Sequence, residues 1–296
     1  MLKLDDQAAL FCTGSRAVNP DHVPFTQAYL TEHYGLKVHY GEDTYRSLPA
    51  KARARIFLDY LFNDEIKLLW AFRGGEGSAD VIPYLEKEKK KIAALTPKLI
   101  MGLSDITAIL IYFRQMYNWP VAHGPGASQI AYSKVDSKSN EMVRDFLFST
   151  PQKMALDDLE VLNDVASESI SGQLIGGNLS LLNISVKDSW EMKAKEKIVI
   201  IEEVNEKPHV ISRTLKYLQR VACFDGAKAI IFGDFSFQDA EEALKKQTQK
   251  VLNEFAKTCA CPVFKSMQFG HEQQNHLLSF SHEYRIEAQS KKLIYC

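Results

Sequence analysis

Residues 66–116 read IKLLWAFRGGEGSADVIPYLEKEKKKIAALTPKLIMGLSDITAILIYFRQM. Two strand–helix units follow one another in this stretch. An apolar strand at 66–72 leads into a helix at 81–95, and a second strand at 98–101 leads into a helix at 106–116. Strands that alternate with helices are typical of βαβ units, so we predict an α/β fold built on a mostly parallel sheet.

The same alternation continues in both directions along the chain. The pattern predicts further strands at 8–12, 36–39, 198–201 and 229–232, and further helices at 24–33, 50–63, 210–221 and 240–255. It loosens between about 133 and 169, and a glycine-rich patch follows at 172–178. We therefore expect an N-terminal domain at 1–150, a linker at 151–168 and a C-terminal domain at 169–296.

The composition excludes several classes of protein. Of the 296 residues, 46% are hydrophobic and 25% are charged, as in ordinary globular proteins, and 36 Lys and Arg against 37 Asp and Glu leave a net charge of −1. Such a chain has no overall field that would attract nucleic acid or an anionic membrane, which favours a small-molecule partner.

Five cysteines, an odd number, do not suggest a disulfide framework. The N-terminal residues do not resemble a signal peptide and no stretch is apolar enough to span a membrane, so we expect a cytoplasmic protein.

A serine follows the second strand of the opening stretch. The strand stops at Gly102, Ser104 comes two residues later, and a helix begins at once. A serine on such a turn projects above the sheet, and the backbone N–H of Asp105 lies at a helix N-terminus, where it can stabilise an oxyanion. The alternative is that Ser104 only caps the helix, since the second glycine of a Gly-x-Ser-x-Gly motif is missing.

The turn at 73–78 also connects a strand to a helix. It lacks the third glycine of a dinucleotide-binding motif and the lysine of a phosphate-binding loop. Its glycines allow backbone N–H groups to approach a ligand oxygen, so Gly75 is a candidate second oxyanion donor. The alternative is a tight loop that exposes Arg73 and Glu76.

An acidic segment and a histidine complete the candidate chemistry. Glu202 and Glu203 come directly after the strand at 198–201, where α/β sheets build sites, although acids there are often a solvated edge. His271 suits a general base on a loop. Because His276 lies five residues on, rather than the four that a zinc-protease helix requires, no metal site is predicted.

These residues give the order serine, acid, histidine, which fits a triad defined by the roles of its members. His123, in the turn His-Gly-Pro-Gly, is the one other histidine in a pattern typical of functional sites.

With its motifs considered together, the chain resembles the LD-carboxypeptidase family of serine peptidases, which includes muramoyl-tetrapeptide carboxypeptidases and microcin-immunity hydrolases. The motifs that carry the resemblance are Arg73-Gly74-Gly75, Gly102-Leu103-Ser104-Asp105, His123-Gly124-Pro125, Gly176-Gly177-Asn178-Leu179, Ile201-Glu202-Glu203-Val204-Asn205-Glu206 and Phe269-Gly270-His271-Glu272-Gln273.

The resemblance implies a role for each candidate residue. Ser104 is then the nucleophile, His271 the base and Glu202, rather than Glu203 or Glu206, the acid that orients the base. The backbone N–H groups of Asp105 and Gly75 form the oxyanion hole, and no metal or cofactor is implied. Arg73 is a candidate for binding the carboxylate of the substrate. Glu76 and Gly126 depart from the family pattern, which affects the fit of the substrate.

The resemblance also implies a fold and a reaction. The N-terminal α/β domain carries the serine, a smaller mixed α/β C-terminal domain carries the glutamate and the histidine, and the site lies at their junction, commonly in a homodimer. The expected reaction is hydrolysis of the amide bond that releases the terminal D-Ala of a murein tetrapeptide. The alternatives are a microcin-immunity type of hydrolase that acts on aminoacyl-nucleotide-like compounds, a non-catalytic binding protein of the same fold, and a zinc hydrolase, which the histidine spacing opposes.

Overall fold

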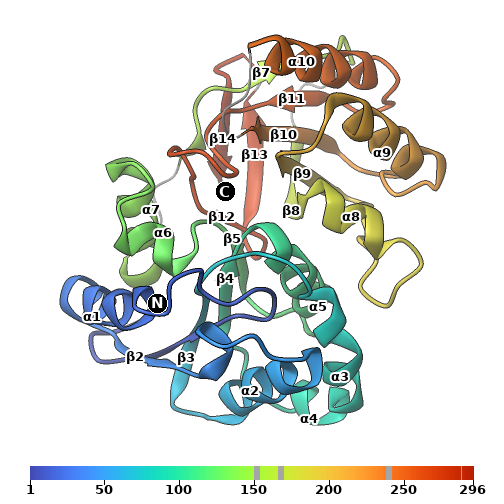
Figure 1. Ribbon diagram of the computed structural model, residues 1–296. Helices are drawn as coiled ribbons and strands as arrows, with labels where there is room; N and C mark the ends of the chain where they lie inside the picture. Colours follow the sequence, from blue (N-terminus) through green and yellow to red (C-terminus); the bar gives the residue numbers. More distant parts are fainter. Residues whose placement is uncertain (150–153, 166–169, 238–241, 288) are drawn as a thin grey trace.

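The computed structural model describes residues 1–149, 154–165, 170–237, 242–287 and 289–296, and its two halves lie one above the other in Figure 1. The first half contains a six-stranded sheet in the order β12-β5-β4-β3-β1-β2. Strands β1 to β5 run parallel, and the short β12 pairs antiparallel with β5. The strands are β1 (Gln7–Phe11), β2 (Lys37–Tyr40), β3 (Ile66–Ala71), β4 (Leu99–Gly102), β5 (Val121–His123) and β12 (Leu278–Ser279).

Helices cover both faces of this sheet, because successive side chains of a strand point to opposite faces. Ala9 and Phe11 of β1 pack into one apolar core, whereas Ala8 and Leu10 pack into another. The first core includes α2 (Ala50–Phe62), α3 (Ile82–Lys87) and α5 (Thr107–Tyr117), and the second includes α1 (His22–Tyr34), α6 (Ala127–Ala131) and α7 (Ser137–Phe148). The predicted parallel α/β arrangement of the first half is therefore confirmed.

One predicted helix is divided. In place of a continuous helix at 81–95, the chain forms a 3-10 turn at 79–81, then α3, then α4 (Lys89–Ala93). Glu88 separates the two helices, with φ −103° and ψ 10°, outside α-helical geometry. The two short helices α3 and α4 still bury the apolar residues whose spacing predicted one helix, which are Ile82, Leu85 and Ile92.

The second half contains an eight-stranded mixed sheet in the order β6-β14-β13-β8-β9-β10-β11-β7. Its central strands β8 to β11 run parallel, and the outer strands pair antiparallel. The strands are β6 (Met154–Leu156), β7 (Glu160–Val161), β8 (Ile170–Asn178), β9 (Lys197–Val204), β10 (Ala229–Ser236), β11 (Val263–Lys265), β13 (Glu283–Glu287) and β14 (Lys292–Tyr295). The helices of this half are α8 (Leu179–Ser185), α9 (Pro208–Arg220) and α10 (Glu242–Ala256).

The stretch between 133 and 169 is more regular than its pattern predicts. It contains α7, whose first turn is capped by Asp136 through a 2.7 Å hydrogen bond from the Ser139 N–H, and it supplies β6 and β7 to the second sheet. The glycine-rich patch is part of β8. A Cβ on Gly176 would lie 2.0 Å from the Ile200 carbonyl oxygen, so β8 needs glycine there to approach β9. The division into domains at 150 and 169 stays a prediction.

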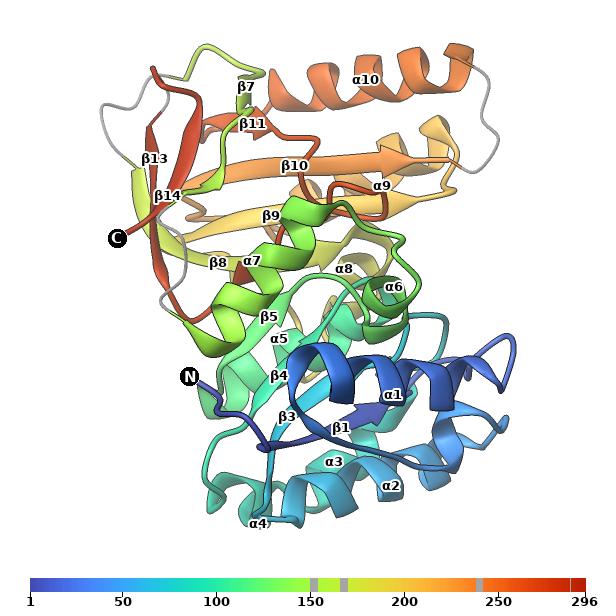
Figure 2. The same ribbon diagram turned by 90° about the vertical axis from the view of Figure 1, so that its left-hand side faces the viewer.

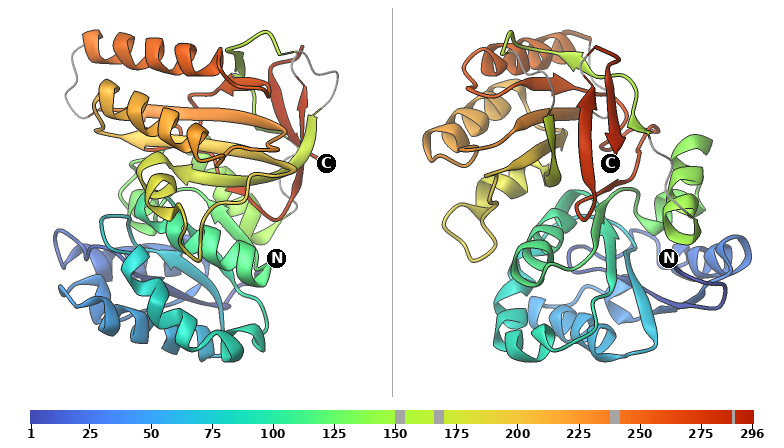
Figure 3. Two further views of the ribbon diagram at one scale, coloured as in Figure 1. Left: turned by 90° about the vertical axis from the view of Figure 1, so that its right-hand side faces the viewer. Right: turned by 180° about the vertical axis from the view of Figure 1, so that it is seen from behind.

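The two halves share strands and a core. β12 returns from the second half to the edge of the first sheet, where Leu278 pairs with His123 (Figure 1). Figures 2 and 3 show the second half lying over the first from the other sides of the molecule. The core around α5 continues into the second sheet without interruption. The predicted fold class, a mostly parallel N-terminal sheet with flanking helices followed by a mixed α/β half, is confirmed. Within the described ranges, no helix is both long and apolar enough to cross a membrane.

Candidate active site

Ser104 lies in a strained turn at the carboxyl end of β4. It is the first residue of a 3-10 turn (Ser104–Ile106) that leads into α5, and its φ of +63° is in the left-handed region. The residue at the capping position is Leu103, so Ser104 does not fill the capping role. A Cβ on Gly74 would lie 2.7 Å from Ser104 Cβ and 2.9 Å from its Oγ. The glycine turn after β3 therefore packs directly against the serine.

A cavity of about 710 Å³ opens between the two halves. Ser104 lines it together with two other predicted residues of the first half, Arg73 and Gly75, and with His271 of the second half. Its other walls include residues of the motifs that carry the resemblance, which are Gly74, Leu103, Val204, Asn205, Glu272 and Gln273. The sequence did not indicate the remaining walls, which are Ser128, Gln129, Lys134, Ser236 and Phe237. The cavity therefore joins a serine, a histidine and a glycine turn that are distant in the sequence.

Glu202 lies behind His271, fully buried in β9. Its Oε2 is 2.7 Å from His271 Nδ1, and its Oε1 is 3.5 Å from Nε2 of His123, which is also fully buried. His271 is 17% exposed and lines the cavity. Because Nδ1 faces the carboxylate, Nε2 is the imidazole nitrogen left for chemistry in the cavity. The contact between His123 and Glu202 was not predicted, although the His-Gly-Pro-Gly turn marked His123 as unusual.

The proximity of Glu202 and His271 changes both of their pKa values. Burial alone would raise the pKa of Glu202, but the charge of His271 and the nearby imidazole of His123 outweigh it and lower this pKa to about 2. Burial alone would lower the pKa of His271, but the Glu202 carboxylate, with help from Asp234, raises it to about 9. The acid therefore stays ionised and favours the protonated imidazole.

Glu203, the next residue, has a different environment. Its Oε1 accepts hydrogen bonds from Asn178 Nδ2 (2.8 Å) and from the Val204 N–H (2.8 Å), and its Oε2 accepts from the N–H and the hydroxyl of Ser180 (2.9 and 2.7 Å). These bonds attach the start of α8 to β9. Glu202 and Glu203 thus contact different groups, as expected for adjacent residues of a strand.

Asp105 positions the glycine turn through its side chain. The carboxylate is buried and its Oδ2 accepts a 2.8 Å hydrogen bond from the Ser78 N–H. The Ser78 hydroxyl in turn lies 2.8 Å from Thr13 Oγ1. Within the described residues, the backbone N–H of Gly75 has no acceptor, whereas that of Glu76 donates to Ser15 Oγ. This side-chain role of Asp105 had no signal in the sequence.

Asp234, at the end of β10, holds the loop that carries His271. Its Oδ2 accepts a 3.0 Å hydrogen bond from the Glu272 N–H, and a Cβ on Gly270 would lie 2.4 Å from the same oxygen. Burial, reinforced by the charge of Glu202, raises the pKa of Asp234 to about 7. A Gly-Asp pair after a buried strand is the signal that could have indicated this residue.

The two histidines of the 271–276 segment do not act together. His276 is buried and its Nδ1 lies 2.9 Å from the Ala155 carbonyl oxygen, on the other side of the loop. In the part of the chain that the structure describes, no three His, Cys, Asp or Glu residues are grouped as metal ligands. The cations of the cavity are Arg73, which was a predicted candidate, and Lys134, which was not.

Two family models match the chain. The model of the LD-carboxypeptidase N-terminal domain matches residues 9–124, and the model of the LD-carboxypeptidase C-terminal domain matches residues 171–286. The first match contains Ser104, and the second contains Glu202 and His271.

Individual relatives agree with these models. The protein named "Putative carboxypeptidase RC0549" from Rickettsia conorii is 33% identical to this chain, covering 80% of it and 73% of the relative. The murein tetrapeptide carboxypeptidase of Pseudomonas aeruginosa is 27% identical, covering 92% of this chain and 90% of the relative.

Solved structures share the fold. A muramoyltetrapeptide carboxypeptidase from Oxalobacter formigenes has a TM-score of 0.81 at 19% identity, covering 98% of this chain and 97% of its own. An MccF-like protein from Bacillus anthracis has a TM-score of 0.82 at 19% identity, with coverages of 99% and 97%. At such identities the likeness establishes the fold alone.

Proposed function

This chain belongs to the LD-carboxypeptidase family of peptidases, and we propose that it is a serine carboxypeptidase that releases the terminal D-Ala from murein tetrapeptides. The observation that carries the proposal is the cavity at the junction. Around this space lie the strained Ser104 turn, the glycine turn and His271, with Glu202 buried behind His271. The murein tetrapeptide carboxypeptidase relative supports the choice of substrate.

In the proposed reaction, Ser104 Oγ attacks the carbonyl carbon of the last amide bond. His271 Nε2 accepts the hydroxyl proton and then gives it to the departing D-Ala amine, while Glu202 stabilises the imidazolium. The N–H groups of Asp105 and Gly75 hold the oxyanion of the tetrahedral intermediate, each donor being worth roughly 3 kcal/mol. Water, deprotonated by His271, then cleaves the acyl-enzyme and releases the tripeptide.

A cation in the cavity must recognise the terminal carboxylate. Arg73 was the predicted candidate, and Lys134 lines the same cavity. We retain Arg73 for this role, because its guanidinium can bind a carboxylate through two parallel hydrogen bonds and it adjoins the glycine turn. Arg73→Gln should then remove the preference for a free terminal carboxylate over an amide, and Lys134→Gln should not.

The test is release of alanine from three matched peptides that end in D-Ala, L-Ala or D-alaninamide, followed by mass spectrometry. We expect cleavage of the first, little of the second and a large loss with the third. Ser104→Ala should abolish release, whereas Ser189→Ala, an exposed serine outside the cavity, should not change it. Comparable rates on all three peptides, or turnover by Ser104→Ala, would contradict the proposal.

A second candidate is a microcin-immunity type of hydrolase. It is favoured by Phe237, whose ring lines the cavity and could stack on a nucleobase. Under this alternative an aminoacyl-adenylate analogue would be cleaved faster than the D-Ala peptide, and Phe237→Ala would slow only the nucleotide reaction. The homodimer and the cytoplasmic location implied by the resemblance stay predictions.

A further inference from the structure

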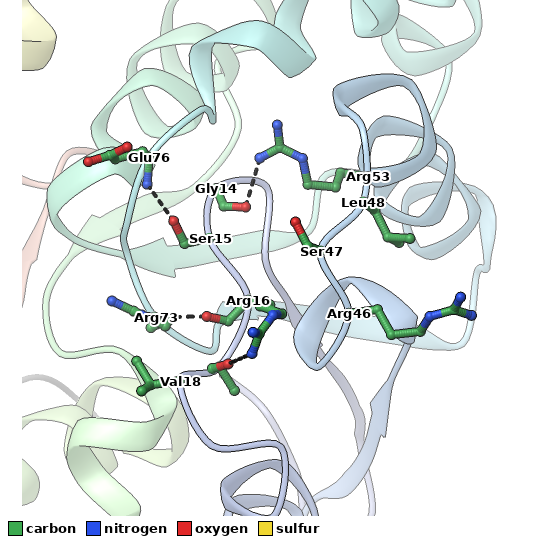
Figure 4. A pocket seen from close by; sticks show the side chains of 11 residues that line it. Gly14, Ser15, Arg16, Val18, Arg46, Ser47, Leu48, Arg53, Arg73 and Glu76 are labelled. Atoms are coloured by element: carbon green, nitrogen blue, oxygen red, sulfur yellow. Dashed lines mark hydrogen bonds between the residues drawn. The ribbon is translucent and has the colours of Figure 1, made fainter.

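A second cavity, of about 440 Å³, adjoins the first. It is formed by the loops that follow β1, β2 and β3, together with the first turns of α2 (Figure 4). Arg73 lines both cavities. Of the turn that follows it, Gly74 and Gly75 line the first cavity and Glu76 lines the second. A ligand could therefore extend from one cavity to the other past a single turn of chain.

The topology of the first sheet places this cavity where α/β proteins bind ligands. The chain passes from β1 to β2 at one edge and then crosses to β3 on the other side of β1, which gives the order β2-β1-β3-β4-β5. Strand order reverses between β1 and β3, and α/β proteins commonly bind ligands at the carboxyl ends of strands beside such a point. The loops after β1 and β3 contact each other there, since the Glu76 N–H donates to Ser15 Oγ, and residues of both loops line the cavity.

The lining carries an excess of positive charge. It includes four arginines and one carboxylate, that of Glu76, which Figure 4 shows turned away from the guanidinium groups. Arg46 pairs with Glu42 at 2.5 Å and extends away from the other three. Within the described residues, Arg16, Arg53 and Arg73 have no carboxylate oxygen within 4.0 Å.

These three guanidinium groups are positioned by backbone carbonyl groups rather than neutralised. Arg16 donates to the Ala17 oxygen (2.7 Å), Arg73 to the Arg16 oxygen (3.1 Å) and Arg53 to the Gly14 oxygen (2.7 Å). Nε of Arg53 is buried and has no acceptor among the described residues. Because a guanidinium has five N–H donors, Arg16 and Arg53 keep donors for a ligand oxygen in this cavity, whereas Arg73 is already assigned to the terminal carboxylate in the first cavity.

We infer that this cavity is an anion-binding subsite that holds a second negatively charged group of the substrate, a carboxylate or a phosphate, away from the bond that is cleaved. The choice of the peptide as its source rests on the proposed function. Guanidinium groups bind carboxylates and phosphates through paired, charge-assisted hydrogen bonds. Ser15 and Ser47, which also line the cavity, add hydroxyl donors beside them.

Arg16 is the residue with which to test the subsite. Arg53 donates hydrogen bonds to the backbone oxygens of Thr13 and Gly14, which hold the loop after β1, so its removal would disturb the fold. Arg16 is exposed, and its side chain bonds only to its own loop. Arg55→Gln is the matched control, because Arg55 is exposed on α2, outside the cavity lining, and its substitution removes the same charge.

The first arm of the experiment compares two tetrapeptides that end in D-Ala and differ only in whether the side chain of the second residue ends in a carboxylate or a carboxamide. The wild-type protein should have a KM about tenfold lower for the carboxylate peptide, with little change in kcat. Arg16→Gln should abolish this preference, and Arg55→Gln should retain it. The second arm measures the shift in Tm caused by inorganic phosphate against sodium chloride of equal ionic strength, in the same three proteins.

The two arms distinguish the source of the anion. A peptide preference that depends on Arg16 identifies a carboxylate of the substrate, and a phosphate effect that depends on Arg16 without a peptide preference identifies a phosphate group. If neither effect depends on Arg16, the inference is wrong. If the wild-type protein releases no alanine from either peptide, the proposed function is wrong. The dependence of the phosphate-induced shift in Tm on Arg16 then tests the anion-binding subsite by itself.

Discussion

Glu202 and Glu203 are adjacent and both buried, but only Glu202 contacts the imidazoles of His271 and His123, whereas Glu203 binds Asn178 and Ser180. We predict that Glu202→Gln lowers kcat by about 10⁴, because an amide cannot stabilise the imidazolium in the same way. Glu203→Gln should leave kcat nearly unchanged. It should instead lower the free energy of unfolding by about 1–3 kcal/mol, since the amide nitrogen would face groups that donate hydrogen bonds.

Steady-state kinetics and urea unfolding of the two variants measure these effects. Equal losses of kcat, or a larger loss in Glu203→Gln, would show that the acids are assigned wrongly.

The raised pKa of His271 predicts the pH dependence of the reaction. The neutral imidazole is the base, so kcat/KM should increase with pH, and the midpoint of this increase should lie near the His271 pKa of about 9. Glu202→Gln removes the charge that favours the imidazolium, and the pKa of His271 should fall toward the ordinary histidine value of roughly 6.5. NMR titration of the imidazole measures this shift even where turnover is too slow.

The same ionisation affects stability. The folded protein binds the proton of His271 more tightly than the unfolded chain does. The protonated His271 therefore contributes its full stabilisation below about pH 6.5, and this stabilisation is lost as the pH rises through about 9. A pKa of His271 that does not move in Glu202→Gln would contradict the assigned ion pair.

At the scale of elements, the turn after β3 is positioned by its contacts with the turn after β4. Gly74 lies so close to Ser104 that a methyl group would displace one of the two turns. We predict that Gly74→Ala lowers kcat about 10²-fold, because a shift of about 1 Å at a reacting group has such an effect. Gly172→Ala in β8 is the control, since its Cβ would have no neighbour closer than 3.3 Å. Wild-type kcat in Gly74→Ala would show that the turn does not contribute to the site.

The elements also show which features can be predicted from sequence. Apolar residues correctly indicated β1, β3 and β4, whose side chains pack into the cores on both faces of the sheet. They also indicated β2 and α2, each of which buries one side in a local core. Apolar periodicity missed α7, whose first turn is polar, and β8, whose glycines hide the strand pattern. The motifs indicated Ser104 and His271 as candidates.

Other features depend on tertiary contacts that no local pattern contains. Asp105 reaches Ser78 across 27 residues of sequence, and Asp234 reaches Glu272 across 38. His123 contacts Glu202 from the other half of the molecule. Local motifs therefore predicted which residues are chemically suited to the site, but the residues that support them became evident only from the packing.

For the molecule as a whole, the cavity depends on how firmly the two halves are joined. α5 is buried on nearly every side, with Ala108, Ile109, Leu110 and Ile111 all inaccessible to solvent, and it packs against both β8 and α8. The strand β12 crosses to the first sheet and pairs with His123. Separation of the halves would expose this apolar surface to water, which costs a free energy of roughly 25 cal/mol for each Å² exposed.

We therefore predict that the two halves unfold in one cooperative transition. The tryptophans allow each half to be observed separately, since Trp70 and Trp119 are buried in the first half and Trp190 in the second. Trp190→Phe leaves fluorescence from the first half alone, and the double variant Trp70→Phe/Trp119→Phe leaves fluorescence from the second. In each variant, the urea midpoint measured by fluorescence should coincide with the midpoint measured by far-UV circular dichroism, which reports the whole chain. A fluorescence transition that precedes the circular dichroism transition in one variant and follows it in the other would show that the halves fold independently. The cavity would then lie between two separable domains rather than within one cooperative structure.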